Sequence, residues 1–197
     1  MIQTLIFATN NQNKVNEIRS VLDNNFEIIT LKEAGININI PEPHHTLEEN
    51  AREKSTVINK LTAKNCFSED TGLEVTALNS EPGVKSARYA GDDANFKNNI
   101  EKLLNNLRDV KNRTAQFRTV ISLILNSKEY QFEGICKGSI TTKEIGTNGF
   151  GYDAVFIPNG SAKTFAEMNM EEKNIFSHRK KATAKFINFL KKYHGQG

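Results

Sequence analysis

The fold class is decided by residues 1–31, MIQTLIFATNNQNKVNEIRSVLDNNFEIITL. Within them, Leu5-Ile6-Phe7-Ala8 is an uninterrupted apolar run of the length typical of a buried strand. Val15 and Ile18 then recur at helical spacing, and residues 26–31 are strand-like again. A strand, a helix and a second strand in this order predict a β-α-β unit and therefore an α/β fold.

A second helix begins at a capping motif. Thr46 is followed three residues later by Glu49, the spacing of a capping box. The helical period then places Ala51, Ile58 and Leu61 on one apolar stripe, which we expect to face the core.

The second half of the chain predicts a long hairpin. Residues 115–125 carry apolar side chains on both faces, as in a central strand, and residues 126–129 turn this strand back into residues 130–136. A late strand is expected over residues 152–157, and a final helix from near Ser177. Strands that alternate with helices, plus one hairpin, favour a mixed sheet over an all-parallel one.

The composition suits a single globular domain. The chain has 197 residues, 12 of them Phe, and a net charge of +3 from 26 basic and 23 acidic residues. This excess is too small to indicate nucleic acid, whereas an anionic small molecule is compatible with it. Apolar runs are too short to span a bilayer and no leader precedes the first strand, so we expect no membrane partner and no secretion. Cys66 and Cys136 lie in apolar segments, which predicts buried free thiols in a reducing cytoplasm.

A polar loop follows the first strand and opens the first helix. Its sequence is Thr9-Asn10-Asn11-Gln12-Asn13-Lys14. Backbone N–H groups and the helix dipole favour a phosphate at such a position, and the Lys adds a full charge. The glycines and the Lys-Ser/Thr pair of a Walker loop are missing. An ordinary solvated turn explains the same pattern equally well.

Acidic residues provide a candidate metal site. Glu69-Asp70-Thr71-Gly72 follows a strand-like segment, and Glu42 is presented between two prolines. Carboxylate oxygens are the ligands that Mg²⁺ prefers. Because neighbouring side chains on an extended segment point to opposite faces, Glu69 and Asp70 need not reach the same ion. Taken alone, each acid is more often a solvated loop residue.

Three further features have both a functional and an ordinary interpretation. Lys54 lies on the apolar side of its helix, one turn after Asn50, so it either snorkels outward or enters a polar cleft. A glycine-rich loop carries two aromatic side chains, which can stack on a base or pack into the core; its last residues are Phe150, Gly151, Tyr152 and Asp153. Near the last helix, Lys173, His178 and Arg179 can read an anion or a carbonyl oxygen, or can form a basic helix face.

Taken together, these motifs resemble those of the inosine triphosphate pyrophosphatase family, which removes non-canonical purine nucleoside triphosphates. The resemblance extends over essentially the whole chain. The family's Thr/Ser-x-Asn-x-x-Lys loop, Glu-Asn-Ala-x-x-Lys helix and acidic Asp-Asp-Ser-Gly turn each have a counterpart, as do its later signatures. The matching segments are residues 9–14, 49–54, 69–72, 82–83, 86–91, 149–153 and 172–179. One such motif is weakly specific, but several in order are highly specific.

The resemblance implies a fold and an activity. The fold would be one domain over residues 1–197, a long curved mixed β-sheet with helices, whose two lobes flank a central nucleotide-binding cleft. The activity would be Mg²⁺-dependent hydrolysis of ITP, dITP and XTP to the monophosphate and pyrophosphate. The resemblance further implies a homodimer, because members of the family are commonly homodimers.

Residue roles follow from the same resemblance. It assigns catalysis to Asp70 as proton acceptor, with Lys54 and Glu69, and the metal to Glu42 and Asp70. The nucleotide contacts would be Thr9, Asn10, Asn11, Gln12, Asn13, Lys14, Thr71, Phe150, Gly151, Tyr152, Asp153, Lys173, His178 and Arg179.

The chain departs from the family pattern at a few positions. Asn10 and Asn13 stand where many members have Gly, and Asn is the least costly other residue in a left-handed turn. Glu69 replaces an Asp and adds a methylene, while Thr71 replaces a Ser and keeps the hydroxyl. Two alternative functions stay open on the sequence alone: a pyrophosphatase for modified pyrimidine nucleotides, and a catalytically silent nucleotide-binding or RNA-binding protein.

Overall fold

A computed structural model of the protein describes residues 3–20 and 26–194. Its strands are β1 (Gln3–Phe7), β2 (Phe26–Thr30), β3 (Cys66–Val75), β4 (Pro82–Gly83), β5 (Thr114–Leu125), β6 (Lys128–Ile140) and β7 (Phe156–Pro158). Its α-helices are α1 (Gln12–Arg19), α2 (Leu47–Thr62), α3 (Phe96–Asn106), α4 (Met170–Phe176) and α5 (His178–His194). Short 3₁₀ turns occupy Thr76–Leu78, Ser86–Arg88, Asp153–Val155 and Phe165–Glu167.

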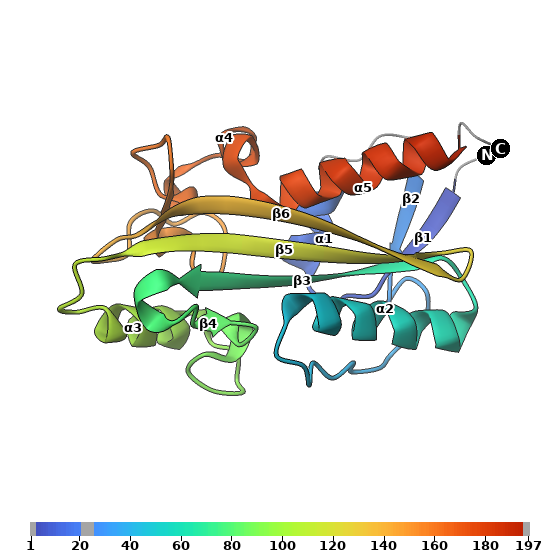
Figure 1. The fold of residues 1–197 in the computed structure, drawn as a ribbon, viewed down its shortest axis with the longest axis horizontal. Helices are drawn as coiled ribbons and strands as arrows, with labels where there is room; N and C mark the ends of the chain where they lie inside the picture. The colour runs from blue at the N-terminus through green and yellow to red at the C-terminus, as the bar shows by residue number, and fades with distance from the viewer. Residues whose placement is uncertain (1–2, 21–25, 195–197) are drawn as a thin grey trace. The chain divides into compact units, whose positions relative to one another are not determined.

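The strands form a mixed sheet. Their order within the described residues is β2-β1-β3-β5-β6-β7, with β4 beside β3 (Figure 1). β1 pairs in parallel with both β2 and β3, whereas β4 and β7 pair antiparallel with β3 and β6. The predicted α/β class with a mixed sheet is therefore confirmed.

The chain divides into two compact units. The first contains the described residues up to Asp70, residues 119–134 and those from Arg179 onward; the second contains residues 71–118 and 135–178. Strands β3, β5 and β6 contribute residues to both units.

In the first unit, strand alternation builds an apolar layer on each face of the sheet. Leu5 and Phe7 belong to a cluster with residues of α1 and α5, including Phe186. Ile6 points to the opposite face and clusters with Ile58 of α2. Because helices cover both faces, Leu5, Ile6 and Phe7 of β1 are all apolar, which is why this part of the strand forms an unbroken apolar run.

In the second unit, an aromatic cluster forms the core. Phe117 of β5 packs edge-on against Phe156 at 4.7 Å between ring centroids, and Phe165 lies 5.3 Å from Phe156. Leu73 of β3 and Leu103 of α3 belong to the same buried cluster.

Two predicted elements are confirmed, although the second strand of the hairpin, Lys128–Ile140, is longer than the predicted residues 130–136. Thr46 is the N-cap of α2 and its hydroxyl accepts the Glu49 N–H at 3.2 Å. The predicted hairpin is β5 and β6, joined through Asn126 and Ser127 at φ of 50° and 65°, the left-handed conformations that a two-residue hairpin turn requires.

Other expectations were wrong in detail. Leu61 is 58% exposed instead of buried, because it lies in the last turn of α2, beyond the reach of the sheet cluster that buries Ile58. The late strand begins at Phe156, since Asp153–Val155 form a 3₁₀ turn. Glu69 and Asp70 lie within continuous strand β3, not in a turn after a shorter strand.

Candidate active site

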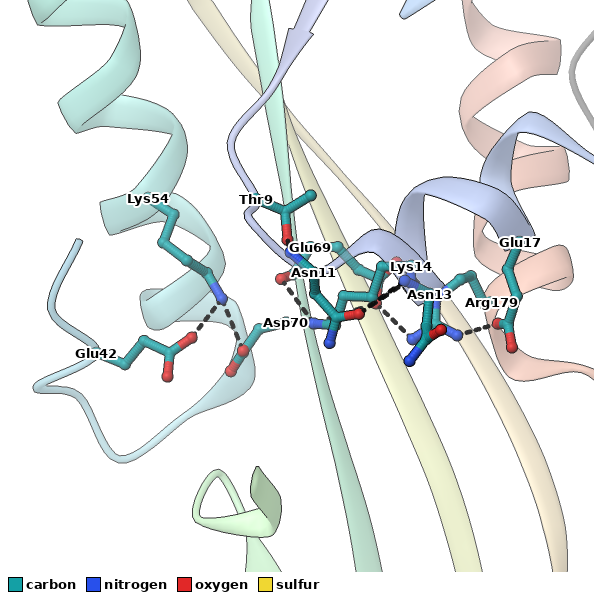
Figure 2. Close-up of polar contacts among 10 residues, drawn as sticks. All are labelled: Thr9, Asn11, Asn13, Lys14, Glu17, Glu42, Lys54, Glu69, Asp70 and Arg179. Atoms are coloured by element: carbon teal, nitrogen blue, oxygen red, sulfur yellow. Dashed lines mark hydrogen bonds and ion pairs between the residues drawn. The ribbon is translucent and has the colours of Figure 1, made fainter. Parts of the chain in front are cut away.

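The polar loop after β1 forms a capped helix start. The Asn11 side chain is the N-cap of α1 and accepts the backbone N–H groups of Asn13 at 3.0 Å and Lys14 at 3.3 Å. The Thr9 hydroxyl accepts the Asn11 N–H at 3.1 Å, which fixes the approach to the helix (Figure 2). Neither Asn10 nor Asn13 has a positive φ. The left-handed backbone conformation that would favour Gly is therefore not adopted at either position. The loop holds Lys14 in the first turn of α1.

Lys54 joins two carboxylates. Its Nζ donates to Glu42 Oε1 at 2.7 Å and to Asp70 Oδ1 at 2.8 Å (Figure 2). Lys54 is 7% exposed and Asp70 is 6% exposed, so this Lys does not snorkel outward. Lys54 extends from α2, Asp70 from β3, and Glu42 from the segment that precedes α2. Three residues that the sequence proposed separately thus form one cluster.

Glu69 belongs to a second cluster on the other face of β3. Arg179 donates to it through two nitrogens, Nε to Oε2 at 2.8 Å and Nη2 to Oε1 at 2.9 Å, and Nη1 donates to Glu17. Lys14 Nζ lies 3.4 Å from Glu69 Oε1. The opposite directions of Glu69 and Asp70 follow from the alternation of side chains along a strand. Glu69 therefore contacts the cation of the polar loop and not Lys54.

Glu17 was missed by the sequence analysis. It is 7% exposed, lies one helical turn after Lys14, and pairs with a residue 162 positions away. Its only signal in the sequence is a carboxylate at i+3 from a candidate phosphate-binding Lys.

Burial shifts the pKa values in both clusters. Burial lowers the pKa of Lys14, and the nearby Glu69 carboxylate only partly opposes this. Burial also opposes the charge of Lys54, but Asp70 and Glu42 outweigh it and raise the Lys54 pKa. For Asp70, burial raises the pKa above the ordinary 3.8, with Lys54 and Lys14 acting in the opposite direction. The proton of Asp70 is thus held more tightly than that of an exposed carboxyl.

The Lys54 cluster has the donor set of a Mg²⁺ site. Mg²⁺ in phosphate-processing sites uses one or two carboxylates and takes its other ligands from water and substrate phosphates. Glu42 and Asp70 supply two carboxylates, and Asp70 Oδ2 is buried with no hydrogen-bond partner among the residues described. In residues 3–20 and 26–194, no group of three or more His, Cys, Asp or Glu side chains is placed so that it could hold a metal ion.

In the second unit, the glycine-rich loop closes on Asp153. Asp153 Oδ2 accepts the Phe150 backbone N–H at 2.9 Å and Lys173 Nζ at 2.8 Å. Lys173 Nζ also lies 5.4 Å from the centroid of the Phe150 ring, within cation–π range. Gly149 and Gly151 have φ of +77° and +61°, which L side chains rarely adopt. The structure thus brings together three of the residues predicted to contact nucleotide.

Other predicted residues of this unit lie outside that set of contacts. The Tyr152 hydroxyl donates to Ser86 O at 2.9 Å. The His178 ring stacks on Phe117 with centroids 4.7 Å apart and an interplanar angle of 12°. Thr71 follows Asp70 on β3 and is partly buried. The sequence did not indicate that Phe117 supports the His178 ring, because the two are 61 positions apart in the chain.

Comparison with known protein families assigns the whole chain to one family. Residues 5–189 match the family model described as the Ham1 family. A dITP/XTP pyrophosphatase of Flavobacterium psychrophilum is 48% identical over 187 residues, covering 95% of this chain and 98% of the relative. A protein of the same name from Flavobacterium johnsoniae is 49% identical, covering 94% of this chain and 97% of the relative.

Solved structures give the same fold. The Ham1 protein of Staphylococcus aureus superposes with a TM-score of 0.89 at 38% identity, covering 97% of this chain and 100% of that structure. A nucleoside-triphosphatase / dITP/XTP pyrophosphatase from Mycobacterium abscessus superposes with a TM-score of 0.78 at 36% identity, covering 93% of this chain and 98% of that structure.

Among the described residues, none of the helices has both the length and the apolar character that a membrane span requires.

Proposed function

The chain belongs to the Ham1 family, and from that premise we propose that it is a nucleoside-triphosphate pyrophosphatase acting on non-canonical purine nucleotides. Its substrates would be dITP, ITP and XTP, and its products the monophosphate and pyrophosphate. The observation that carries the proposal is the Glu42–Lys54–Asp70 cluster, in which Lys54 and Asp70 are buried and Glu42 is partly buried, and whose charges suit a metal-bound phosphate chain. The cytoplasmic location stays a prediction from the two free cysteines, and the homodimer stays a prediction from the resemblance.

The chemistry is an in-line attack of water on the α-phosphorus. The water oxygen forms the new P–O bond, the bond to the β-phosphate oxygen breaks, and pyrophosphate leaves with that electron pair. Asp70 Oδ2 would accept the proton of the attacking water, because it is buried and bonded to no other described group. Reactions of this type depend mainly on positioning and on neutralisation of charge.

Charge neutralisation would come from the first unit. Glu42 and Asp70 would hold Mg²⁺, which when bound supplies positive charge against the phosphate oxygens. Lys14, at the N-terminus of α1, would bind the phosphate chain together with the helix N-terminus. Lys54 fixes the carboxylates of Glu42 and Asp70 against each other, so that both are positioned before substrate arrives.

Base contacts are assigned to the second unit. Phe150 would stack on the base, and Asp153 and Lys173 hold the loop that carries its ring. The base-edge role of Arg179 stays a prediction from the resemblance. In the structure, three of its guanidinium nitrogens donate to the carboxylates of Glu69 and Glu17.

Base choice would rest on hydrogen-bond polarity. Hypoxanthine and xanthine present a carbonyl acceptor at position 6, whereas adenine presents an amino donor. A donor such as His178 favours the carbonyl, and a buried donor left facing the adenine amine costs about 1–3 kcal/mol. That cost corresponds to a difference in kcat/KM of roughly 5- to 150-fold.

The test is pyrophosphate release from dITP, ITP, XTP, dUTP, GTP and ATP, with Mg²⁺ and with chelator. We expect rapid release from the first three substrates only with Mg²⁺, and at least about a fivefold lower kcat/KM for ATP. Asp70→Asn is the control for the site, since it keeps the shape and removes the base; we expect it to lose nearly all turnover. Equal rates on ITP and ATP would refute the base-edge argument, and a preference for dUTP would favour the modified-pyrimidine alternative.

A further inference from the structure

Glu42 lies on a segment that has no helix or strand of its own. Residues 36–43 are irregular, so backbone hydrogen bonds of a helix or sheet do not fix the position of the carboxylate. On the N-terminal side, Ile36, Ile38 and Ile40 pack against the apolar cluster beneath α2. Pro41 and Pro43 restrict the backbone on either side of Glu42. The segment is thus anchored before Glu42 and stiff around it.

After Glu42, the anchor is the side chain of Asn50. Asn50 Oδ1 accepts the backbone N–H of His44 at 3.0 Å, and Asn50 Nδ2 donates to the backbone oxygen of His44 at 3.1 Å. The amide therefore pairs with both polar groups of one residue, two positions after Glu42. Asn50 is 1% exposed, so its amide group would be costly to leave without these hydrogen bonds.

Asn50 and Lys54 are one helical turn apart on α2. Side chains four residues apart lie on the same face of a helix. From that face, Asn50 binds the backbone beyond Glu42, and Lys54 Nζ binds the Glu42 carboxylate at 2.7 Å. Two side chains one turn apart on α2 thus hold Glu42: Asn50 through the backbone that follows it, and Lys54 through its carboxylate.

We propose that Asn50 is a positioning residue that sets the Glu42 carboxylate for metal binding. The inference rests on the proposed pyrophosphatase function and deepens it, since Asn50 touches neither metal nor nucleotide in this assignment. A ligand that is held in place loses less conformational freedom on binding the ion. Groups that orient a metal ligand typically change metal affinity by about 10–100-fold when they are removed.

The substitution Asn50→Ala removes both bonds to His44 and leaves Glu42, Asp70 and Lys54 unchanged. We expect the dissociation constant for Mn²⁺ and the Mg²⁺ concentration for half-maximal pyrophosphate release each to rise about tenfold. At saturating Mg²⁺, kcat should return close to the wild-type value, because the reacting groups are intact. A purely structural role predicts a lower melting temperature with unchanged metal dependence.

The experiment measures Mn²⁺ binding to the purified full chain by electron paramagnetic resonance, and Mg²⁺ titrations of activity on dITP. Four proteins are compared with the wild type: Asn50→Ala, Glu42→Gln, the double variant, and Asn99→Ala. Asn99 is the matched control. It is also 1% exposed and on a helix, and its side chain also holds loop backbone, accepting from Ala90 N at 2.6 Å and donating to Ala87 O at 2.9 Å.

If Asn50 acts through Glu42, the double variant binds metal no more weakly than Glu42→Gln alone. Unchanged metal affinity in Asn50→Ala, an additive loss in the double variant, or an equal loss in Asn99→Ala would overturn the inference. Circular dichroism confirms folding, and Asn50→Ser, whose hydroxyl can bond one His44 group, replaces an Asn50→Ala protein that does not fold. A wild-type chain that binds no Mn²⁺ and releases no pyrophosphate would instead overturn the proposed function.

Discussion

At the scale of single residues, the neighbours Glu69 and Asp70 have different partners. Asp70 contacts Lys54 in a cluster with Glu42, while Glu69 is paired with the guanidinium group of Arg179 and lies near Lys14. Both carboxylates are nearly fully buried, and each is compensated by cations on its own face of β3. We infer that Glu69 supports the phosphate-binding loop and that the metal depends on Asp70 and Glu42.

The raised pKa of Asp70 has a consequence for metal binding. Burial holds its proton at pH values above the ordinary 3.8, and the metal binds only the ionised carboxylate. As pH falls through the raised pKa, protons compete with the ion, so Mn²⁺ affinity should decline up to about tenfold per pH unit. The decline should begin at a pH where an exposed carboxyl is still ionised.

Mn²⁺ titrations across a series of pH values measure this dependence. Glu42→Gln should bind Mn²⁺ more weakly and keep a decline that begins at a lower pH, because the Glu42 carboxylate adds to the raised pKa of Asp70. Asp70→Asn should lose the part of the decline that Asp70 causes. An affinity for Mn²⁺ that stays constant until the pH reaches the pKa range of exposed carboxyl groups would contradict the assignment of Asp70 as a metal ligand.

At the scale of residues, local rules predicted only part of the site. Strand alternation correctly predicted that Glu69 and Asp70 point to opposite faces. Lys54 lies on the apolar side of its helix, and of the two predicted alternatives for it, a polar cluster and not the solvent is what the structure shows. The partners themselves did not follow from local rules, since Glu42 and Asp70 come from segments on either side of α2. Glu17 could not be found because its partner Arg179 is distant in the chain.

At the scale of elements, secondary structure was predicted correctly where the hydrophobic residues of a segment follow one clear periodicity, that of a helix or that of a strand. β1, α2 and the hairpin of β5 and β6 follow from apolar runs, a cap and a polar turn. The segment around residues 149–158 was harder, because its hydrophobic residues suggested a strand. Glycines at positive φ and the Asp153 carboxylate instead fold its first part into turns.

The loop between Gly149 and Asp153 provides a prediction at this scale. A Cβ at position 149 would lie 2.1 Å from Asp153 Oδ2, so Gly149→Ala must displace the carboxylate that binds Phe150 N and Lys173. Gly151 has a similar φ of +61° but nothing within 4 Å of its Cβ position, which makes Gly151→Ala a matched control.

Both substitutions carry the backbone cost of about 1–2 kcal/mol for a left-handed Ala. Gly149→Ala adds the cost of disturbing a buried ion pair, which we expect to lower the free energy of unfolding by roughly 2 kcal/mol more than Gly151→Ala. Urea denaturation of the two proteins measures this difference. Equal destabilisation would show that Asp153 adjusts without loss.

At the scale of the whole molecule, the two units are built on shared strands. The core of the first unit uses Phe67 of β3 and Leu123 of β5, and the core of the second uses Leu73 and Phe117 of the same strands. Neither unit can unfold without releasing residues that continue into the other. We therefore expect one cooperative transition instead of two.

Substitution of one buried Phe in each core tests this cooperativity. Phe186 in the first unit and Phe165 in the second are both 0% exposed, and Phe→Ala in a core costs about 3–5 kcal/mol. For a chain of this size, either loss should lower the melting temperature on the order of 10 °C. Scanning calorimetry should show a single peak in the wild type and in both variants, with calorimetric and van't Hoff enthalpies in agreement. A peak that splits, with Phe186→Ala moving one part and Phe165→Ala the other, would show that the shared strands do not couple the units.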